Sequence, residues 1–225
     1  MGFLKAAFMK ILALLGYELR RSTEFRACFS NFNNLTQAYE QLLNDSGNLI
    51  VANNIRSNLL VRLLGTPPSE AYFIVHALAK CKDTRGDVCE FGVAQGEASA
   101  LIANEIESSN KILHLFDSFK GLPKPSTKDQ LKDDIFSLGK IEAYTGKMSC
   151  PEEMVYSRLK AISFPLHRFV VHKGFIDQVL RDDSSIPKEV SFAYIDFDFY
   201  EPIKLTLDFL HRITSIGAII IGTIT

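Results

Sequence analysis

The pattern of apolar positions changes at Gly86. Before this glycine, apolar residues recur three and four positions apart, which is typical of amphipathic helices. This spacing is found in three segments: Leu35–Leu43, Ile55–Leu64 and Glu70–Lys80. Two prolines separate the last segment from the others, and Ser69 is suited to cap it. We therefore expect residues 1–65 to form a helical extension, a cap over the ligand-binding edge of a second unit at residues 66–225.

After Gly86, apolar runs of strand length alternate with helical segments. Five strands are expected at Asp87–Gly92, Ile112–Phe116, Arg168–His172, Val190–Asp196 and Gly217–Ile221. Helices are expected at Glu97–Glu107, Lys128–Leu138, Pro151–Ile162, Ile176–Leu180 and Pro202–Ile213. Such alternation predicts right-handed βαβ units and an α/β fold with a doubly wound parallel sheet, for which the strand order 3-2-1-4-5 is the simplest.

Composition excludes several classes of function. The formal net charge is -1, so no basic field exists to attract nucleic acid. The four cysteines are scattered, with no C-x-x-C pair or Cys/His cluster, which disfavours disulfides and a zinc site. A reducing, cytoplasmic compartment is therefore expected.

Residues 1–21 carry apolar positions at helical spacing, interrupted by Lys5 and Lys10. The stretch is too short and too charged to span a bilayer, and Ala6 breaks the myristoylation pattern. No A-x-A cleavage site follows it. Two interpretations stay open. The segment either packs on the domain or on a second subunit, since we expect a homo-oligomer, or it lies as a basic amphipathic helix on a membrane surface, peripheral to it.

The chemistry is expected just after each strand, because a doubly wound sheet binds ligands at the carboxyl ends of its strands. After the first strand, Gly92 and Gly96 have the spacing G-x-x-x-G, unlike the G-x-G-x-x-G of pyrophosphate binders, and Glu90 precedes them. The turn runs on through Val93 to Ser99. The carboxylate of Glu90 would attract an ammonium group, such as that of S-adenosylmethionine, and would repel a phosphate. An ordinary glycine turn with a solvated Glu90 explains the same residues.

The next two strands are also followed by candidate binding residues. Asp117 ends the second strand, where its carboxylate can accept hydrogen bonds from ribose hydroxyls, and Ser118 follows it. Gly174 and Phe175 follow the third strand, where an adenine ring would lie. The alternatives are a helix cap or surface acid at Asp117 and a turn with a buried aromatic ring at Phe175.

Asp196 and Asp198 follow the fourth strand, and two carboxylates in this place repel unless a cation lies between them. The cation would be a divalent metal, the sulfonium of the cofactor or a substrate, and oxygen ligands suit magnesium. Alternatively, one of the two aspartates caps the next helix.

Four stretches together resemble the macrocin-type (TylF-like) O-methyltransferase family. They are Gly86–Val93, Phe116–Pro123, His172–Phe175 and Tyr194–Glu201. The resemblance implies a Rossmann-like class I methyltransferase fold and methyl transfer from S-adenosylmethionine to a hydroxyl of a small molecule, often a sugar of a natural product. It implies that Glu90, Gly92 and Asp117 hold the cofactor, and that magnesium binds near the fourth strand.

The complete set of expected site residues follows from these positions. The cofactor-binding candidates are Glu90, Gly92, Val93, Gly96, Ser99, Asp117, Ser118, Gly174, Phe175 and Asp196. Asp196 and Asp198 are the catalytic and metal-ligand candidates. The polar stretch Lys120–Cys150 is expected to form a lid that selects the acceptor.

The sequence departs from the family pattern after the fifth strand. Members carry a pair of aspartates there that completes the metal site, whereas this chain reads Ile220–Thr225. We therefore expect the last hairpin of the sheet to be missing. We expect either a truncated form or a loss of part of the chemistry. Two alternatives to an enzyme that transfers methyl groups follow: a non-catalytic subunit that serves as an interaction module, and a nicotinamide-dependent oxidoreductase, which the glycine spacing and Glu90 disfavour.

Overall fold

The computed structural model describes residues 34–35, 37–38, 41–42, 54–63, 65–132, 134–182 and 184–222. Its helices are α3 (Asn54–Leu60), α4 (Pro68–Lys80), α5 (Glu97–Glu105), α6 (Glu152–Ala161), α7 (Ile176–Asp182) and α8 (Tyr200–Ile213). Its strands are β1 (Asp87–Phe91), β2 (Leu113–Asp117), β3 (Phe169–Lys173), β4 (Val190–Ile195) and β5 (Thr214–Gly222). Two short 3-10 helices lie at Ile141–Tyr144 and Leu166–Arg168. All five predicted strands are therefore present, with shifted ends.

The strands form one parallel sheet in the order β3-β2-β1-β4-β5, as the alternating pattern predicts. The register pairs Glu90 of β1 with Leu115 of β2 and with Tyr194 of β4. The order reverses beside β1, so the carboxyl ends of β1 and β4 flank the switch point. This Rossmann-like arrangement fixes which residues meet at the ligand-binding edge.

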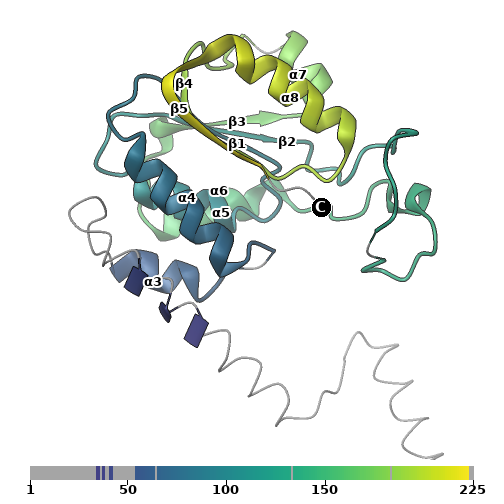
Figure 1. Cartoon of the computed structure of the whole chain (residues 1–225), viewed down its shortest axis with the longest axis horizontal. Helices are drawn as coiled ribbons and strands as arrows, with labels where there is room; N and C mark the ends of the chain where they lie inside the picture. The colour runs from purple at the N-terminus through teal and green to yellow at the C-terminus, as the bar shows by residue number, and fades with distance from the viewer. Residues whose placement is uncertain are drawn as a thin grey trace, which may run out of the picture.

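Helices cover both faces of the sheet (Figure 1). On one face, α4, α5 and α6 pack against alternate strand residues such as Val88, Leu115 and Tyr194. On the other face, α7 and α8 cover the opposite set, including Cys89 and Phe116. Because successive strand residues point to opposite faces, β1 contributes to both cores and is buried on both sides.

Only part of the predicted helical extension lies among the described residues. Helix α3 lies outside α4 and α5 as a further layer (Figure 1). Its Leu60 packs in a small third core with Val75 of α4 and Leu101 of α5. Its Arg56 binds Glu105, at the end of α5 far from the carboxyl edge, with atoms 2.5 and 2.7 Å apart. The described helix α3 therefore packs on α4 and α5, and the predicted cap over the ligand-binding edge stays a prediction. In Leu35–Leu43, the described residues are 35, 37, 38, 41 and 42, and they are helical.

The helix predicted at Lys128–Leu138 is wrong, because the described residues there form turns and coil. Asp134 accepts hydrogen bonds from the backbone N–H groups of Leu138 and Gly139 and from the hydroxyl of Tyr144. Asp129 accepts from the backbone and hydroxyl of Ser126. Such local side-chain bonds compete with helical ones, so the apolar spacing is outweighed.

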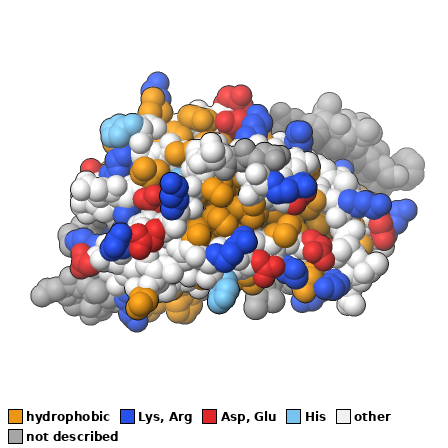
Figure 2. Space-filling view, turned by 90° about the horizontal axis from the view of Figure 1, so that it is seen from above, with side chains coloured by type: hydrophobic (Ala, Val, Ile, Leu, Met, Phe, Trp, Pro, Cys, Tyr) orange, Lys and Arg blue, Asp and Glu red, His pale blue; other side chains and the backbone are white. Residues whose placement is uncertain are grey.

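Apolar side chains are exposed on one face of the molecule. Figure 2 shows hydrophobic side chains gathered in the middle of the face that is uppermost in Figure 1. Exposed large apolar side chains of α8 and β5 include Leu207, Ile216 and Ile220. The predicted homo-oligomer stays a prediction, and residues 1–21 lie outside the described part of the chain. No described helix has the length and apolar character needed to cross a membrane.

Candidate functional site

The turn after β1 is shaped by close contact with β4. Gly92 has φ +88°, and a Cβ atom on it would lie 2.3 Å from the backbone oxygen of Asp196. Gly96 has φ +80°, and its Cβ would lie 3.1 Å from Val155 of α6. Both glycines are therefore required by close contacts within the chain, and Gly92 brings the turn against the end of β4.

Asp117 holds this turn in place. Its Oδ2 accepts hydrogen bonds from the backbone N–H groups of Val93 and Ala94, at 2.8 and 2.9 Å. Its Oδ1 accepts one from Phe119 at 2.7 Å. A carboxylate has about four acceptor positions, so one position is left for a ribose hydroxyl. The described contacts thus give Asp117 a structural role beside the predicted cofactor contact.

Replacing Asp117 by alanine is expected to lower the free energy of unfolding by about 3 kcal/mol, because three hydrogen bonds of about 1 kcal/mol each are lost. Urea denaturation measures this change. Asp177→Ala, which removes an exposed carboxylate on α7, is the matched control and should change stability by less than about 0.5 kcal/mol. If Asp117 served the ribose alone, its alanine variant would be as stable as the control.

Glu90 is the buried acid of the site. Its side chain is 1% exposed, and neither carboxyl oxygen has a hydrogen-bond partner among the described residues. Burial raises the pKa of Glu90 well above its usual value, and the negative charges of Asp196 and Asp117 raise it further. The nearby hydroxyl of Ser99 acts in the opposite direction on the pKa but makes no hydrogen bond of ordinary length. The alternative of a solvated Glu90 is therefore wrong, because the side chain is buried. A buried acid without a hydrogen-bond partner among the described residues suits a cationic ligand.

The other predicted cofactor residues lie around the same edge. Ser118 is held in its own turn, since its hydroxyl donates to the carbonyl of Gly121 and accepts from the N–H of Lys120. Gly174 bonds back to Asp117 through its backbone N–H at 2.9 Å. Phe175, next to it, is half-buried. Glu90, Asp117 and Gly174 thus lie at the ends of β1, β2 and β3, whereas Ser118 has a local role.

Asp196 and Asp198 lie after β4, as predicted, with Asp196 half-buried and Asp198 exposed. Crowding by the surrounding protein and the charge of Asp196 raise the pKa of Asp198. Within the described residues, no group of three or more His, Cys, Asp or Glu side chains is placed to hold a metal ion. The described residues therefore give no support for the magnesium site that the resemblance implies, and Asp196 and Asp198 stay predicted ligands.

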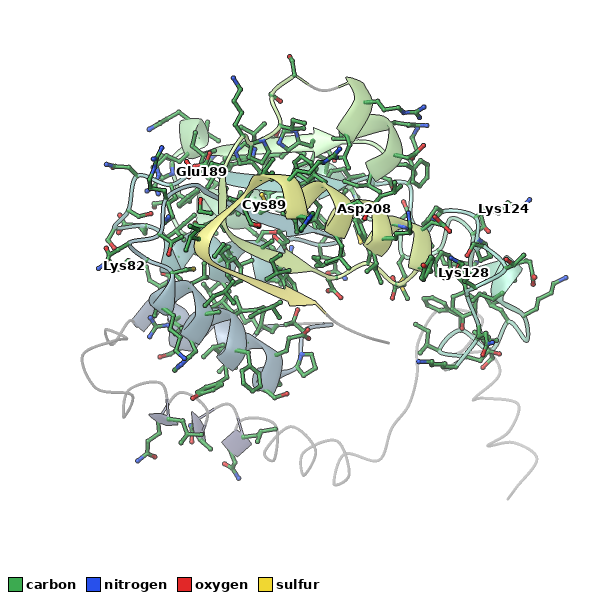
Figure 3. All side chains as sticks on the ribbon, turned by 45° about the horizontal axis from the view of Figure 1, so that its top comes forward. Lys82, Cys89, Lys124, Lys128, Glu189 and Asp208 are labelled. Carbon is green, nitrogen blue, oxygen red and sulfur yellow. The ribbon has the colours of Figure 1, made fainter. Side chains whose placement is uncertain are left out.

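A cavity of about 430 Å³ lies beside Asp198, between the segment 122–148 and the start of α8. Its walls are mainly apolar and include Leu122, Ile135, Ile141, Tyr144, Met148 and Tyr200. Figure 3 labels Lys124 and Lys128 on this segment, which projects beyond the sheet. Lys128 lies 3.9 Å from the centre of the Tyr200 ring, and Asp129 accepts a hydrogen bond from the Tyr200 N–H. The segment is thus fastened to the first residue of α8.

Sequence reasoning missed two residues of this edge, Tyr194 and Glu70. Tyr194 lies two positions before Asp196 on the same face of β4, and its hydroxyl is buried without a hydrogen-bond partner among the described residues. Glu70, in the first turn of α4, lies near Tyr194 and Asp196, and burial raises its pKa. A polar tip in an otherwise apolar strand was the available signal for Tyr194.

A five-stranded parallel sheet with a buried acid and a glycine turn at its switch point defines the Rossmann-like methyltransferase class. Comparison with family models agrees, since residues 75–223 match the model of TylF, macrocin O-methyltransferase. The chain therefore belongs to the TylF family. A search of curated proteins found no significant match.

Solved structures support the same fold. The O-methyltransferase NovP is 20% identical, with a TM-score of 0.56, and the match covers 69% of this chain and 64% of NovP. The calicheamicin methyltransferase CalS11 is also 20% identical with a TM-score of 0.56, and the match covers 92% of this chain and 80% of CalS11. The chain thus spans less than two thirds of NovP. At this identity the likeness concerns the fold.

Proposed function

We propose that this protein transfers a methyl group from S-adenosylmethionine to a hydroxyl of a small molecule, with a sugar of a natural product or glycan as the acceptor class. The observation that carries the proposal is the buried carboxyl of Glu90, which lacks a hydrogen-bond partner among the described residues and lies beside the glycine turn at the switch point. Membership of the TylF family and the likeness to NovP, an O-methyltransferase, support the reaction type.

The residues at the carboxyl edge suit the chemical groups of this cofactor. Glu90 offers a carboxylate to an ammonium group, and Asp117 retains an acceptor position for a ribose hydroxyl. Phe175, after β3, offers an apolar face to an adenine ring. S-adenosylmethionine, when bound, supplies a methyl carbon that an acceptor oxygen takes as the carbon–sulfur bond breaks.

Asp198 is suited to receive the proton of the acceptor hydroxyl. It lines the 430 Å³ cavity, and its raised pKa makes its carboxylate a stronger base than an ordinary aspartate. Asp196, half-buried at the end of β4, would place negative charge beside the cofactor's cationic end. The apolar walls of the cavity would exclude water and orient the acceptor, which is the main contribution of positioning to such a displacement. The described residues include no group of three or more His, Cys, Asp or Glu side chains that could hold magnesium, and the proposed residue roles do not depend on it.

Calorimetric titration with S-adenosylhomocysteine, followed by a methyl-transfer assay on a panel of hydroxylated sugars, tests this function. We expect micromolar binding, no binding of NAD, and methyl transfer that Asp198→Asn lowers by about 100-fold, the usual contribution of a general base. Binding without transfer to any acceptor would favour the non-catalytic module. Binding of NAD in place of S-adenosylhomocysteine would overturn the proposal.

A further inference from the structure

Four buried polar atoms that have no hydrogen-bond partner in the described part of the chain lie on one face of the sheet. They are the two carboxyl oxygens of Glu90, the hydroxyl of Ser99 and the hydroxyl of Tyr194. Glu90 and Tyr194 are register partners on adjacent strands, so their side chains leave the sheet side by side. Each of these three side chains is at most 1% exposed. Leaving such atoms unpaired costs about 1–3 kcal/mol each, so this cluster points to an absent ligand.

Groups from α4 and β4 complete the boundary of this cluster. Glu70 and Thr66 lie close enough to Tyr194 to change its pKa, and Asp196 acts on Glu70, Glu90 and Tyr194 alike. Glu70 and Asp196 also line a hollow of about 830 Å³ between α4 and β5. The cluster therefore joins a fully buried pair, Glu90 and Tyr194, to two carboxyl groups that border an open space.

The chemistry of these groups selects one kind of ligand. The charge of Asp196 raises the pKa of both Glu70 and Glu90, so a cationic group is favoured beside these carboxyl groups. A phenol hydroxyl and carboxylates accept hydrogen bonds, and a primary ammonium donates three of them. A divalent metal fits less well, because no three or more His, Cys, Asp or Glu side chains among the described residues are placed so that they could hold one.

We propose that Tyr194 and Glu70 bind the ammonium group of the amino-acid end of S-adenosylmethionine together with Glu90, so that α4 forms one wall of the cofactor site. This inference rests on the proposed function. Tyr194 accepts one N–H of the ammonium while its own hydroxyl donates to Glu70. Glu70 accepts a second N–H with its other carboxyl oxygen, and Glu90, buried under the turn after β1, accepts the third.

Two ligands that differ in the ammonium-bearing end test this assignment. S-adenosylhomocysteine carries that end, and 5′-methylthioadenosine lacks it while keeping adenine and ribose. Titration calorimetry of Tyr194→Phe and Glu70→Gln should give about tenfold weaker binding of S-adenosylhomocysteine, the loss of one hydrogen bond to a charged group. The affinity for 5′-methylthioadenosine should stay within about twofold of the wild-type value, since its contacts are untouched.

Tyr72→Phe on the same helix and Glu107→Gln beyond the end of α5 are the controls, and they should change neither affinity. Unchanged binding of S-adenosylhomocysteine by both test variants would overturn the inference alone, and so would an equal loss for both ligands. If the wild-type protein binds neither ligand, the proposed function fails and this inference with it. Glu70 is half-buried, so Glu70→Gln carries the test even where Tyr194→Phe does not fold.

Discussion

Replacing Glu90 by glutamine is expected to weaken binding of S-adenosylhomocysteine by about thirty-fold or more, the cost of removing one charge from a buried pair. Glutamine keeps the shape of the side chain and cannot ionise, so the change isolates the charge. In the wild-type protein, the ammonium of the ligand stabilises the ionised carboxylate, which burial otherwise disfavours. Binding should therefore release a proton, and the wild-type affinity should rise with pH, whereas the affinity of the variant should not.

The same variant is expected to be more stable than the wild-type protein in alkaline solution. The pKa of Glu90 is raised in the folded state above its ordinary value of 4.5. The folded protein therefore holds a proton that the unfolded chain loses, so the stability from this group is complete below pH 4.5 and falls as the pH rises. Glu90→Gln removes this fall.

Urea denaturation at pH 5 and pH 8, together with calorimetry in two buffers of different ionisation enthalpy, measures both effects. Glu107→Gln, which alters an exposed acid, is the control and should show the wild-type pH dependence. Equal affinity of the wild-type and Glu90→Gln proteins for S-adenosylhomocysteine would remove Glu90 from the cofactor site. Equal pH dependence of their stability would show that Glu90 is ionised in the folded protein.

The three central strands β1, β2 and β4 were predictable because nearly all of their residues are buried. In β4, all six residues are buried, and the run is shorter than a typical helix, which favours a strand. Parallel connections then fix the strand order, which places Glu90, Asp117 and Asp196 at one edge. The general location of the site therefore follows from the sequence.

Contacts between distant residues were not predictable from spacing. The apolar pattern at Lys128–Leu138 favours a helix, but Asp129 bonds Tyr200 at the start of α8, and Asp134 bonds Tyr144. The pairing of Glu90 with Tyr194 depends on the register between β1 and β4, which the sequence does not specify. The approach of Glu70 depends on where α4 crosses the sheet. Tertiary geometry thus decides which polar residues join the site.

Gly92 and Gly139 give a direct test of how the turn after β1 is built. Both have positive φ, +88° and +75°, so alanine at either position pays the cost of the left-handed conformation. At Gly139 a Cβ atom would meet nothing within 4 Å, whereas at Gly92 it would lie 2.3 and 2.8 Å from the backbone carbonyl of Asp196. Backbone atoms cannot yield as a flexible side chain does.

We therefore expect Gly139→Ala to lower the free energy of unfolding by about 1–2 kcal/mol, the cost of the conformation alone. Gly92→Ala should lower it by more than about 4 kcal/mol, since the turn or the end of β4 must move. Urea denaturation of the two variants measures the difference. Equal losses would mean that the turn can shift away from Asp196 without cost. Where Gly92→Ala still folds, the displaced Asp196 and Glu90 should no longer bind S-adenosylhomocysteine, whereas Gly139→Ala should bind it as the wild-type protein does.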